Sequence, residues 1–181
     1  MNKSILVLSL LALSGLSSIA AAADDNWFVR GEVGQSRLSV NGFSGSNNDT
    51  SLGVRGGYYF TPNFAVEGAY TNYGTPIDDG MVNTIKLDAW ALGVVAKKDF
   101  GPNNTGFFID GRLGLSFNKT KASSQGQSVS DNSTDGYVGV GLGWDFNRNF
   151  GLGLNYDYTK AKAFGFSGHV STVTGGLEAR F

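Results

Sequence analysis

The sequence predicts an all-β chain that folds as an eight-stranded antiparallel up-and-down transmembrane β-barrel. Three observations predict this fold. Residues 1–23 are typical of an export signal, the remaining chain repeats a two-residue alternation in eight segments, and the breaks between those segments are alternately short and long. The 181 residues give room for one domain, so we expect a signal peptide at 1–23 and an outer membrane β-barrel domain at 24–181.

Residues 1–23 have the layout of a secretory signal peptide. Lys3 supplies a positive start, an apolar run covers residues 5–16, and the small residues 21–23 precede Asp24. A membrane-spanning helix is the alternative, but the apolar run is about 12 residues long and a bilayer needs ~20. We therefore expect export, with cleavage at or near Ala23.

Composition narrows the classes of function. The chain has no cysteine, which excludes disulfides, an acylated-cysteine anchor and thiolate chemistry. Loss of Lys3 with the signal peptide would leave 13 of the 14 basic residues against 15 acidic ones, a net charge of −2, which does not favour nucleic-acid binding. The chain combines 27 glycines with 3 Trp, 7 Tyr and 13 Phe and has only 3 prolines, a composition that favours strands over disorder.

The first four segments alternate large apolar residues with small or charged ones, which is the period of a strand with two different faces. The fourth segment is the least regular, and we place Trp90 on its outer face and Lys97 on its inner face. In chain order, the apolar faces are Trp27, Val29 and Val33 in 26–38, Leu52, Val54, Tyr58 and Phe60 in 50–60, Phe64, Val66 and Tyr70 in 63–73, and Trp90, Leu92 and Val94 in 84–97.

The last four segments alternate in the same way, and the chain ends in mid-alternation at Phe181 with Glu178 and Arg180 on the opposite face. Their apolar faces are Phe107, Ile109, Leu113, Leu115 and Phe117 in 105–117, Val138, Val140, Leu142, Trp144 and Phe146 in 135–147, Phe150, Leu152, Leu154, Tyr156 and Tyr158 in 149–160, and Val173, Leu177 and Phe181 in 168–181.

The breaks between segments alternate in length. Consecutive strands joined in this way run antiparallel, so the short turns gather at one end of a barrel and the long loops at the other, as in outer membrane barrels. The short breaks are 61–62, 98–104 and 147–149, and the long breaks are 39–49, 74–83, 118–134 and 161–167.

The large apolar face must point outward. An eight-stranded barrel encloses only enough space for side chains, and eight rows of aromatic and aliphatic residues would overfill it. The surrounding solvent is then lipid, in which a closed barrel leaves no unpaired strand edge. Aromatic residues near the strand ends, with Phe181 at the periplasmic end, would form the two interfacial girdles. A soluble secreted β-protein is the alternative.

The inner face carries charges of both signs. Buried charges must be paired, because each isolated charge costs several kcal/mol. We therefore expect an ion-pair network that fills the lumen, and a narrow gated path for ions is the alternative; a wide pore is excluded at eight strands. The predicted network is Arg30, Glu32, Arg55, Glu67, Lys97, Asp110, Arg112, Asp145, Asp157, Glu178 and Arg180.

With these features the sequence resembles the OmpA-like eight-stranded β-barrels of Gram-negative outer membranes. The ending TGGLEARF is similar to the family's C-terminal strand signal, which implies recognition by the barrel-assembly machinery. Ala179 departs from the larger residue usual at its position. The resemblance implies a monomer of OmpX size, without the peptidoglycan-binding domain of OmpA. The positions that match the assembly signal are Thr174, Gly176, Ala179 and Phe181.

Two motifs suggest chemistry that the pattern does not support. His169 and Ser171 share a face, as in some lipid A deacylases, but Glu178 lies on the opposite face and ~23 Å along the strand from Ser171. The glycine-rich stretch 139–143 would need a following helix to bind a dinucleotide, and the alternation continues through it instead. We expect neither an enzyme nor a cofactor.

The long loops are the remaining candidates for binding. Asp78, Asp79 and Asp131 match no EF-hand, and solvated loop acids are the simpler interpretation. Polar exposed loops of this kind predict host or phage surface ligands as partners. The predicted function is structural, with membrane integrity and surface interaction through four extracellular loops; the alternatives are a low-conductance channel and, third, a lipid A-modifying enzyme. Four lysines at the extracellular strand ends are placed to pair with lipopolysaccharide phosphates: Lys119, Lys121, Lys160 and Lys162.

Overall fold

The computed structural model describes residues 26–40, 46–74, 77–78, 84–124, 127–163 and 166–181. The predicted signal peptide at 1–23 lies outside these residues. Within them the chain forms nine strands, of which β4 (Ile77–Asp78) is a two-residue piece paired with β5. The other strands are β1 (Trp27–Val40), β2 (Ser46–Thr61), β3 (Phe64–Asn72), β5 (Thr84–Asp99), β6 (Gly106–Ser124), β7 (Gln127–Asp145), β8 (Phe150–Ala163) and β9 (Phe166–Arg180).

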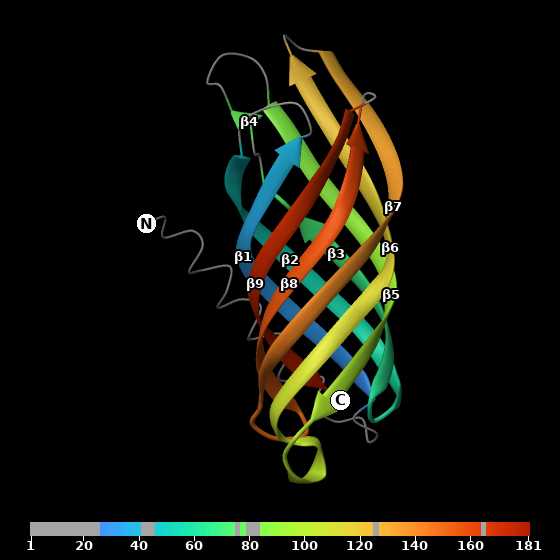
Figure 1. Ribbon diagram of the computed structural model, residues 1–181, viewed down its shortest axis with the longest axis vertical. Coiled ribbons are helices and arrows are strands. Elements are labelled where there is room, and N and C mark those ends of the chain that lie inside the picture. The colour runs from blue at the N-terminus through green and yellow to red at the C-terminus, as the bar shows by residue number, and fades with distance from the viewer. Residues whose placement is uncertain (1–25, 41–45, 75–76, 79–83, 125–126, 164–165) are drawn as a thin grey trace.

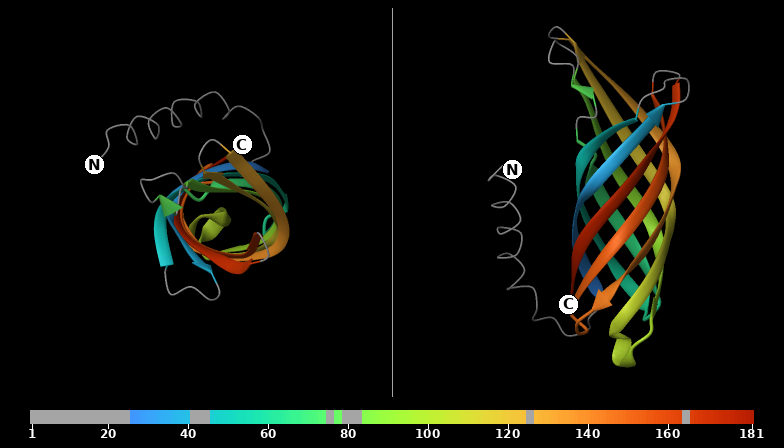
Figure 2. Two further views of the ribbon diagram at one scale, coloured as in Figure 1. Left: turned by 90° about the horizontal axis from the view of Figure 1, so that it is seen from above. Right: turned by 60° about the vertical axis from the view of Figure 1, so that its left-hand side comes forward.

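These eight long strands close into a barrel, as Figures 1 and 2 show. Each strand pairs antiparallel with the next along the chain, β3 pairs directly with β5, and β9 returns to pair with β1. The up-and-down β-barrel predicted from the alternation is therefore confirmed. None of the helices in the described part of the chain has the length and apolar character needed to cross a membrane.

Short turns lie at the end of the barrel that also holds the C-terminus (Figure 1). The β2–β3 turn is tightened by Thr61, whose hydroxyl accepts the N–H of Phe64 at 3.0 Å. In the β7–β8 turn the Asn147 side chain accepts the N–H groups of Asn149 and Phe150, both at 2.8 Å. Polar side chains thus satisfy the backbone donors that each turn removes from the ladder.

At the opposite end the strands run further than the sequence pattern indicates. The prediction of a long loop at 118–134 is wrong, since β6 continues to Ser124 and β7 begins at Gln127. The predicted break at 161–167 is likewise mostly strand, because β8 reaches Ala163 and β9 begins at Phe166. The backbone ladder thus continues beyond the point at which the apolar alternation of the sequence ends.

The inside and outside faces are as predicted in the described part of every long strand. The fourth segment, the least regular in sequence, follows the prediction: Trp90 is 65% exposed, whereas Val95 and Lys97 are each 3% exposed. Along the lipid-facing side of β6, Phe107 and Phe117 are ten residues apart, roughly 25 Å in height for a strand tilted by about 40°. This matches the apolar band of an outer membrane barrel.

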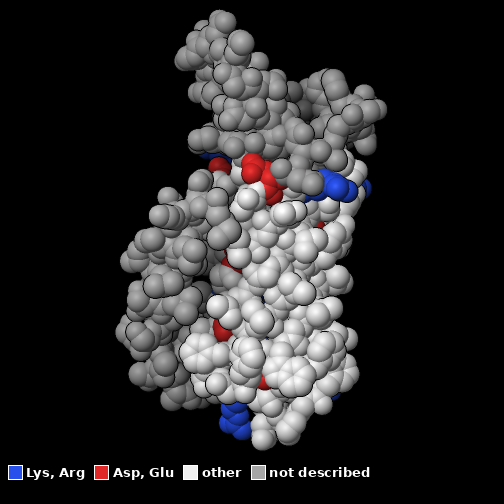
Figure 3. Space-filling model, turned by 90° about the vertical axis from the view of Figure 1, so that its left-hand side faces the viewer, with Lys and Arg blue, Asp and Glu red and all other residues white. Residues whose placement is uncertain are grey.

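Aromatic contacts mark both edges of that band. Near the turn end, the rings of Trp27 and Tyr58 meet edge to face with centroids 5.1 Å apart. Near the other end, Tyr70 and Trp90 lie 4.9 Å apart. On the side shown in Figure 3, Lys and Arg gather at the two ends of the described surface. Such a surface fits a bilayer with its polar boundaries at the two rings of aromatic residues.

Inside, large rings lie against glycines of neighbouring strands. A Cβ at Gly143 would lie 2.6 Å from Cζ of Phe108, and one at Gly114 would lie 2.7 Å from Cε1 of Tyr137. Only hydrogen fits between these rings and the barrel wall. The glycines of the inner face therefore make room for the few bulky residues that fill the lumen.

Candidate functional site: the charged lumen

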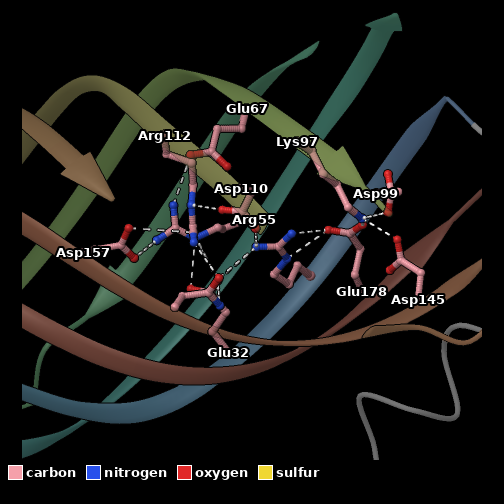
Figure 4. A network of polar contacts seen from close by, with 12 residues as sticks. Glu32, Arg55, Glu67, Lys97, Asp99, Asp110, Arg112, Asp145, Asp157 and Glu178 are labelled. Carbon is pink, nitrogen blue, oxygen red and sulfur yellow. Dashed lines mark hydrogen bonds and ion pairs between the residues drawn. The ribbon is translucent and has the colours of Figure 1, made fainter. Parts of the chain in front are cut away.

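All eleven charged residues of the predicted network lie inside the barrel, and Figure 4 labels all of them except Arg30 and Arg180. Every long strand contributes at least one of them, and ten are buried, with Asp157 of intermediate burial. Sequence alternation placed them on the inner face, and the closure of the sheet brings residues from opposite walls into contact.

Arg55 organises the half of the network nearer the extracellular end. Its Nε donates to both carboxylate oxygens of Glu32, at 3.0 and 2.9 Å, and its Nη1 donates to Oε1 of Glu67 at 3.1 Å. Its Nη2 donates to Asp157 on β8. One guanidinium thus joins β2 to β1, β3 and β8, which uses the forked donor geometry that lysine lacks.

Asn155 joins this half to the rest. Its Oδ1 accepts from Nη1 of Arg30, at 3.3 Å, and from Arg112, while its Nδ2 donates to Glu32 at 3.2 Å. Arg112 also lies 3.1 Å from Asp110 through its Nε. A single amide therefore holds two arginines and a carboxylate at the centre of the lumen.

The half nearer the short turns is a chain of alternating charges. Glu178 accepts from Nε of Arg30 at 2.9 Å and from Nε of Arg180 at 2.7 Å. Asp145 accepts twice from Nη2 of Arg180, both at 2.8 Å, and from Nζ of Lys97 at 2.6 Å. These bonds cross-link β1, β5, β7 and β9 near the periplasmic mouth.

The structure adds three residues to the predicted network. The Tyr137 hydroxyl donates to Glu67, Asn155 occupies the centre, and Asp99 lies 3.8 Å from Lys97. The alternation predicts that Tyr137 and Asn155 face inward, but neither carries a charge that would mark it as part of an ion-pair network. Asp99 fell in a predicted turn, although its spacing of two from Lys97 was the signal that it shares the inner face.

The network separates two spaces. On the extracellular side a cavity of about 30 Å³, room for about two water molecules, lies between Arg55 and the buried ring of Tyr73. On the periplasmic side a vestibule of about 530 Å³ is lined by Tyr59, Lys97 and Arg180, among others. The paired charges lie between these two spaces.

The structure does not assemble the other candidate chemistry. His169 stacks on Tyr158 at the outer surface, with centroids 5.6 Å apart, whereas Glu178 lies inside and is bound to two arginines. The glycine-rich stretch 139–143 stays within β7, with no helix after it. The side chains of four loop candidates lie outside the described residues: Asp78, Asp79, Lys121 and Asp131.

The structure places two of the four lysines predicted at the extracellular strand ends. Lys119 and Lys160 are exposed near that end, and the side chain of Lys162 lies outside the described residues. Among the described residues no group of three or more histidine, cysteine or acidic side chains is arranged to hold a metal ion.

The residues of the predicted assembly signal lie on β9 and at its end. The backbones of Phe181 and Trp27 exchange two hydrogen bonds, of 2.9 and 3.0 Å, so the pairing of the last strand with the first reaches the final residue. Thr174 and Gly176 face inward. Ala179 is buried between its neighbouring strands, with 8% of its surface exposed.

Comparison with known proteins gives this architecture its family. The outer membrane protein beta-barrel domain matches residues 8–181. The chain belongs to this family of outer membrane β-barrels. It is also 30% identical over 93 residues to an uncharacterized protein of Haemophilus influenzae, covering 50% of this chain and 52% of that protein. The match thus spans about half the length of that curated relative.

Solved structures of outer membrane barrels share the fold. Neisserial surface protein A (NspA) superposes with a TM-score of 0.72 at 17% identity, covering 86% of this chain and 97% of NspA. Ail, the attachment invasion locus protein of Yersinia pestis, superposes with a TM-score of 0.59 at 23% identity over 86% of this chain and 99% of Ail. A second Ail structure, with the heparin analogue sucrose octasulfate, gives 0.58 at 24% identity over 86% and 98%.

Proposed function

We propose that this protein is a structural barrel with a closed lumen, and that it acts at the cell surface through its extracellular hairpins. The observation that carries the proposal is that Arg55 bonds to Glu32 and Glu67 on its two neighbouring strands and, across the lumen, to Asp157 on β8. Opening a path would require several buried pairs to separate together. Breaking one such pair costs about 3–5 kcal/mol.

A narrow, low-conductance channel is the second candidate. It is favoured by the two spaces at either side of the network, since only side chains divide the cavity beneath Tyr73 from the periplasmic vestibule. Rotation of a few charged side chains would then act as the gate. The same residues thus support both proposals, and ion current distinguishes them.

Planar-bilayer recording tests the choice, using refolded protein shown to contain native barrel. If the lumen is closed, the wild-type protein should give no unitary currents. Glu67→Gln and Arg112→Gln should then change the stability of the barrel without producing a current. Lys98→Gln serves as the matched control, because Lys98 is exposed and lines neither of the two spaces. Reproducible unitary currents that shift with the two lumen substitutions and not with Lys98→Gln would overturn the structural proposal in favour of the channel.

The remaining expectations complete this proposal. Export through a cleaved signal peptide, assembly through the C-terminal signal and a monomeric state in lipid fit a barrel closed by its own β1–β9 pairing. Exposed Lys119 and Lys160 would pair with phosphates of lipopolysaccharide at the outer leaflet. The Ail complex with a sulfated sugar analogue supports a role for such barrels in binding surface ligands.

Catalysis is not part of the proposal. The His169 ring stacks on Tyr158. Glu178, the carboxylate on the same strand that a deacylase would need, lies in the lumen and is paired with Arg30. Replacing His169 and analysing lipid A by mass spectrometry tests this part directly.

A further inference from the structure

A compact group of aromatic and charged side chains lies on the outward face of β5 and β6, near the extracellular end. Asp88 is the direct ladder partner of Lys119, and two residues further into the membrane Trp90 is the partner of Phe117. The next outward pair toward the membrane centre consists of two leucines. Trp90 is 65% exposed and Phe117 41%. Along the wall the side chains thus change from aliphatic to aromatic to charged, which is the order that suits a lipid from its acyl chains to its head group.

The carboxylate of Asp88 is held from the side away from Lys119. Its Oδ1 accepts the Asn72 amide at 2.7 Å and the Tyr70 hydroxyl at 3.2 Å, and both donors come from β3. The Tyr70 ring also packs against Trp90, so the aromatic and polar residues form one unit. A carboxylate has about four acceptor positions, so Oδ2 keeps the capacity to accept from a further donor.

Lys119 is not that donor. It lies opposite Asp88 in the ladder, yet within the described part of the chain no ion pair joins its ammonium to the carboxylate. Lys119 is exposed, and Asp88 is half-buried. A negative and a positive group therefore lie on adjacent strands, unpaired with each other, beside an exposed indole ring.

We propose that this cluster, formed by Tyr70, Asp88, Trp90 and Lys119, binds a zwitterionic lipid head group in which a phosphate carries an ethanolamine. The phosphate accepts from the Lys119 ammonium. The ethanolamine ammonium donates to Oδ2 of Asp88 and lies on the face of the Trp90 ring, which attracts cations. The inference rests on the proposed pairing of Lys119 with lipid phosphates and adds the groups that recognise the second charge of the ligand.

Charge explains why the ligand is zwitterionic. A head group with negative charge alone would be attracted by Lys119 and repelled by Asp88 on the next strand. Lys160 provides the contrast, because it is exposed near the same end of the barrel and its ladder partner is His169 rather than an acid. Lys160 thus suits an unsubstituted phosphate, whereas the pair of Asp88 and Lys119 suits a phosphate that carries an amine.

Native mass spectrometry of the full barrel, released from nanodiscs of mixed lipid, tests this assignment. The protein is offered two matched pairs of lipids in equal amounts. One pair is phosphatidylethanolamine and phosphatidylglycerol with the same acyl chains, and the other is lipid A with and without phosphoethanolamine. In at least one pair the wild-type protein should retain the ethanolamine lipid roughly fivefold over its match. Equal retention in both pairs would overturn the proposal.

Substitutions locate the preference on the molecule. Asp88→Asn keeps an oxygen that accepts from Asn72 and Tyr70 but removes the charge, so the barrel should fold and the two lipids of a pair should be retained about equally. Lys160→Gln is the matched control and should leave the preference unchanged. A preference that survives in Asp88→Asn, or that Lys160→Gln removes to the same extent, would overturn the assignment to this cluster.

The two pairs also identify the source of the head group. Preference within the phospholipid pair points to phosphatidylethanolamine, preference within the lipid A pair points to substituted lipopolysaccharide, and either result supports the proposal. If unsubstituted lipid A is retained equally well and Lys119→Gln and Lys160→Gln both weaken it, the zwitterionic site fails while the proposed pairing with lipopolysaccharide phosphates stands. If neither lysine substitution changes lipid A retention, that pairing fails as well.

Discussion

Replacing Arg55 with glutamine should destabilise the barrel more than any exposed charge change. The substitution removes the hydrogen bonds to Glu32, Glu67 and Asp157 and leaves two buried carboxylates and the half-buried one of Asp157 near one another. A buried pair that loses one partner costs about 3–5 kcal/mol.

The remaining contacts limit the loss to the size of one such pair. Glu67 keeps the Tyr137 hydroxyl, and Glu32 keeps the Asn155 amide. Arg112 stays 3.7 Å from Asp157. We therefore expect a fall of about 4 kcal/mol in the free energy of unfolding rather than three times that amount.

The assay is reversible urea unfolding in lipid vesicles, followed by tryptophan fluorescence. Arg148→Gln is the matched control because Arg148 is exposed, and it should change stability by less than about 0.5 kcal/mol. Adding Glu67→Gln to Arg55→Gln should restore part of the loss by removing one unpaired carboxylate. If Arg55→Gln falls within about 1 kcal/mol of the control, the network does not hold the barrel together and the reasoning fails.

The remaining predictions test the wall, the lipid face and the enzyme alternative. Gly143→Ala should destabilise by about 1–3 kcal/mol, because its Cβ would lie 2.2 Å from the backbone carbonyl oxygen of Leu152 and 2.6 Å from the Phe108 ring. Gly111→Ala, with nothing within 4 Å, should be tolerated; equal unfolding midpoints would contradict this. Leu113, 61% exposed, lies at the middle of the apolar band, and Leu113→Arg should lower the free energy of unfolding in lipid by about 2–4 kcal/mol. Phe117→Arg, at the edge of the band, should lower it by about 1 kcal/mol or less. A loss of stability that does not depend on depth would disprove this placement of the bilayer. His169→Ala should leave the lipid A mass spectrum unchanged, and disappearance of a deacylated species would establish an enzyme.

The alternation carried most of the fold because lipid imposes a strict rule on one face. In 135–147 each second residue meets hydrocarbon, so Val138, Val140 and Leu142 reveal both the strand and its phase. Above the membrane the rule lapses. The polar run from Gln127 predicts a loop, although its backbone forms the same ladder with β6 as the rest of β7. The strand could therefore be predicted from the sequence only where lipid surrounds it, whatever the strand propensity of its residues.

The charged residues of the lumen were identifiable, but their partners were not. Arg55 and Asp157 lie on β2 and β8, which are not neighbours in the sheet, and they meet only because closure of the barrel brings opposite walls together. Their contact depends on register, which the sequence does not state. The central role of Asn155 escaped notice for a different reason: an uncharged amide gives no signal in a search for opposite charges, although it satisfies three buried groups.

The chemistry of the cations bears on whether the lumen can open. Four of the five are arginines, and Arg55 alone reaches carboxylates on three other strands, so it cannot move without freeing all three at once. Lys97 differs: it is a point charge with one short bond, to Asp145, and its Nζ lies 3.9 Å from the centre of the Phe108 ring. A gate needs a charge that can exchange partners at low cost, and only this periplasmic lysine resembles one. Because the Arg55 cluster lies further along the lumen, movement of Lys97 would enlarge the vestibule without connecting it to the extracellular side, and that asymmetry is the strongest physical argument for a closed barrel.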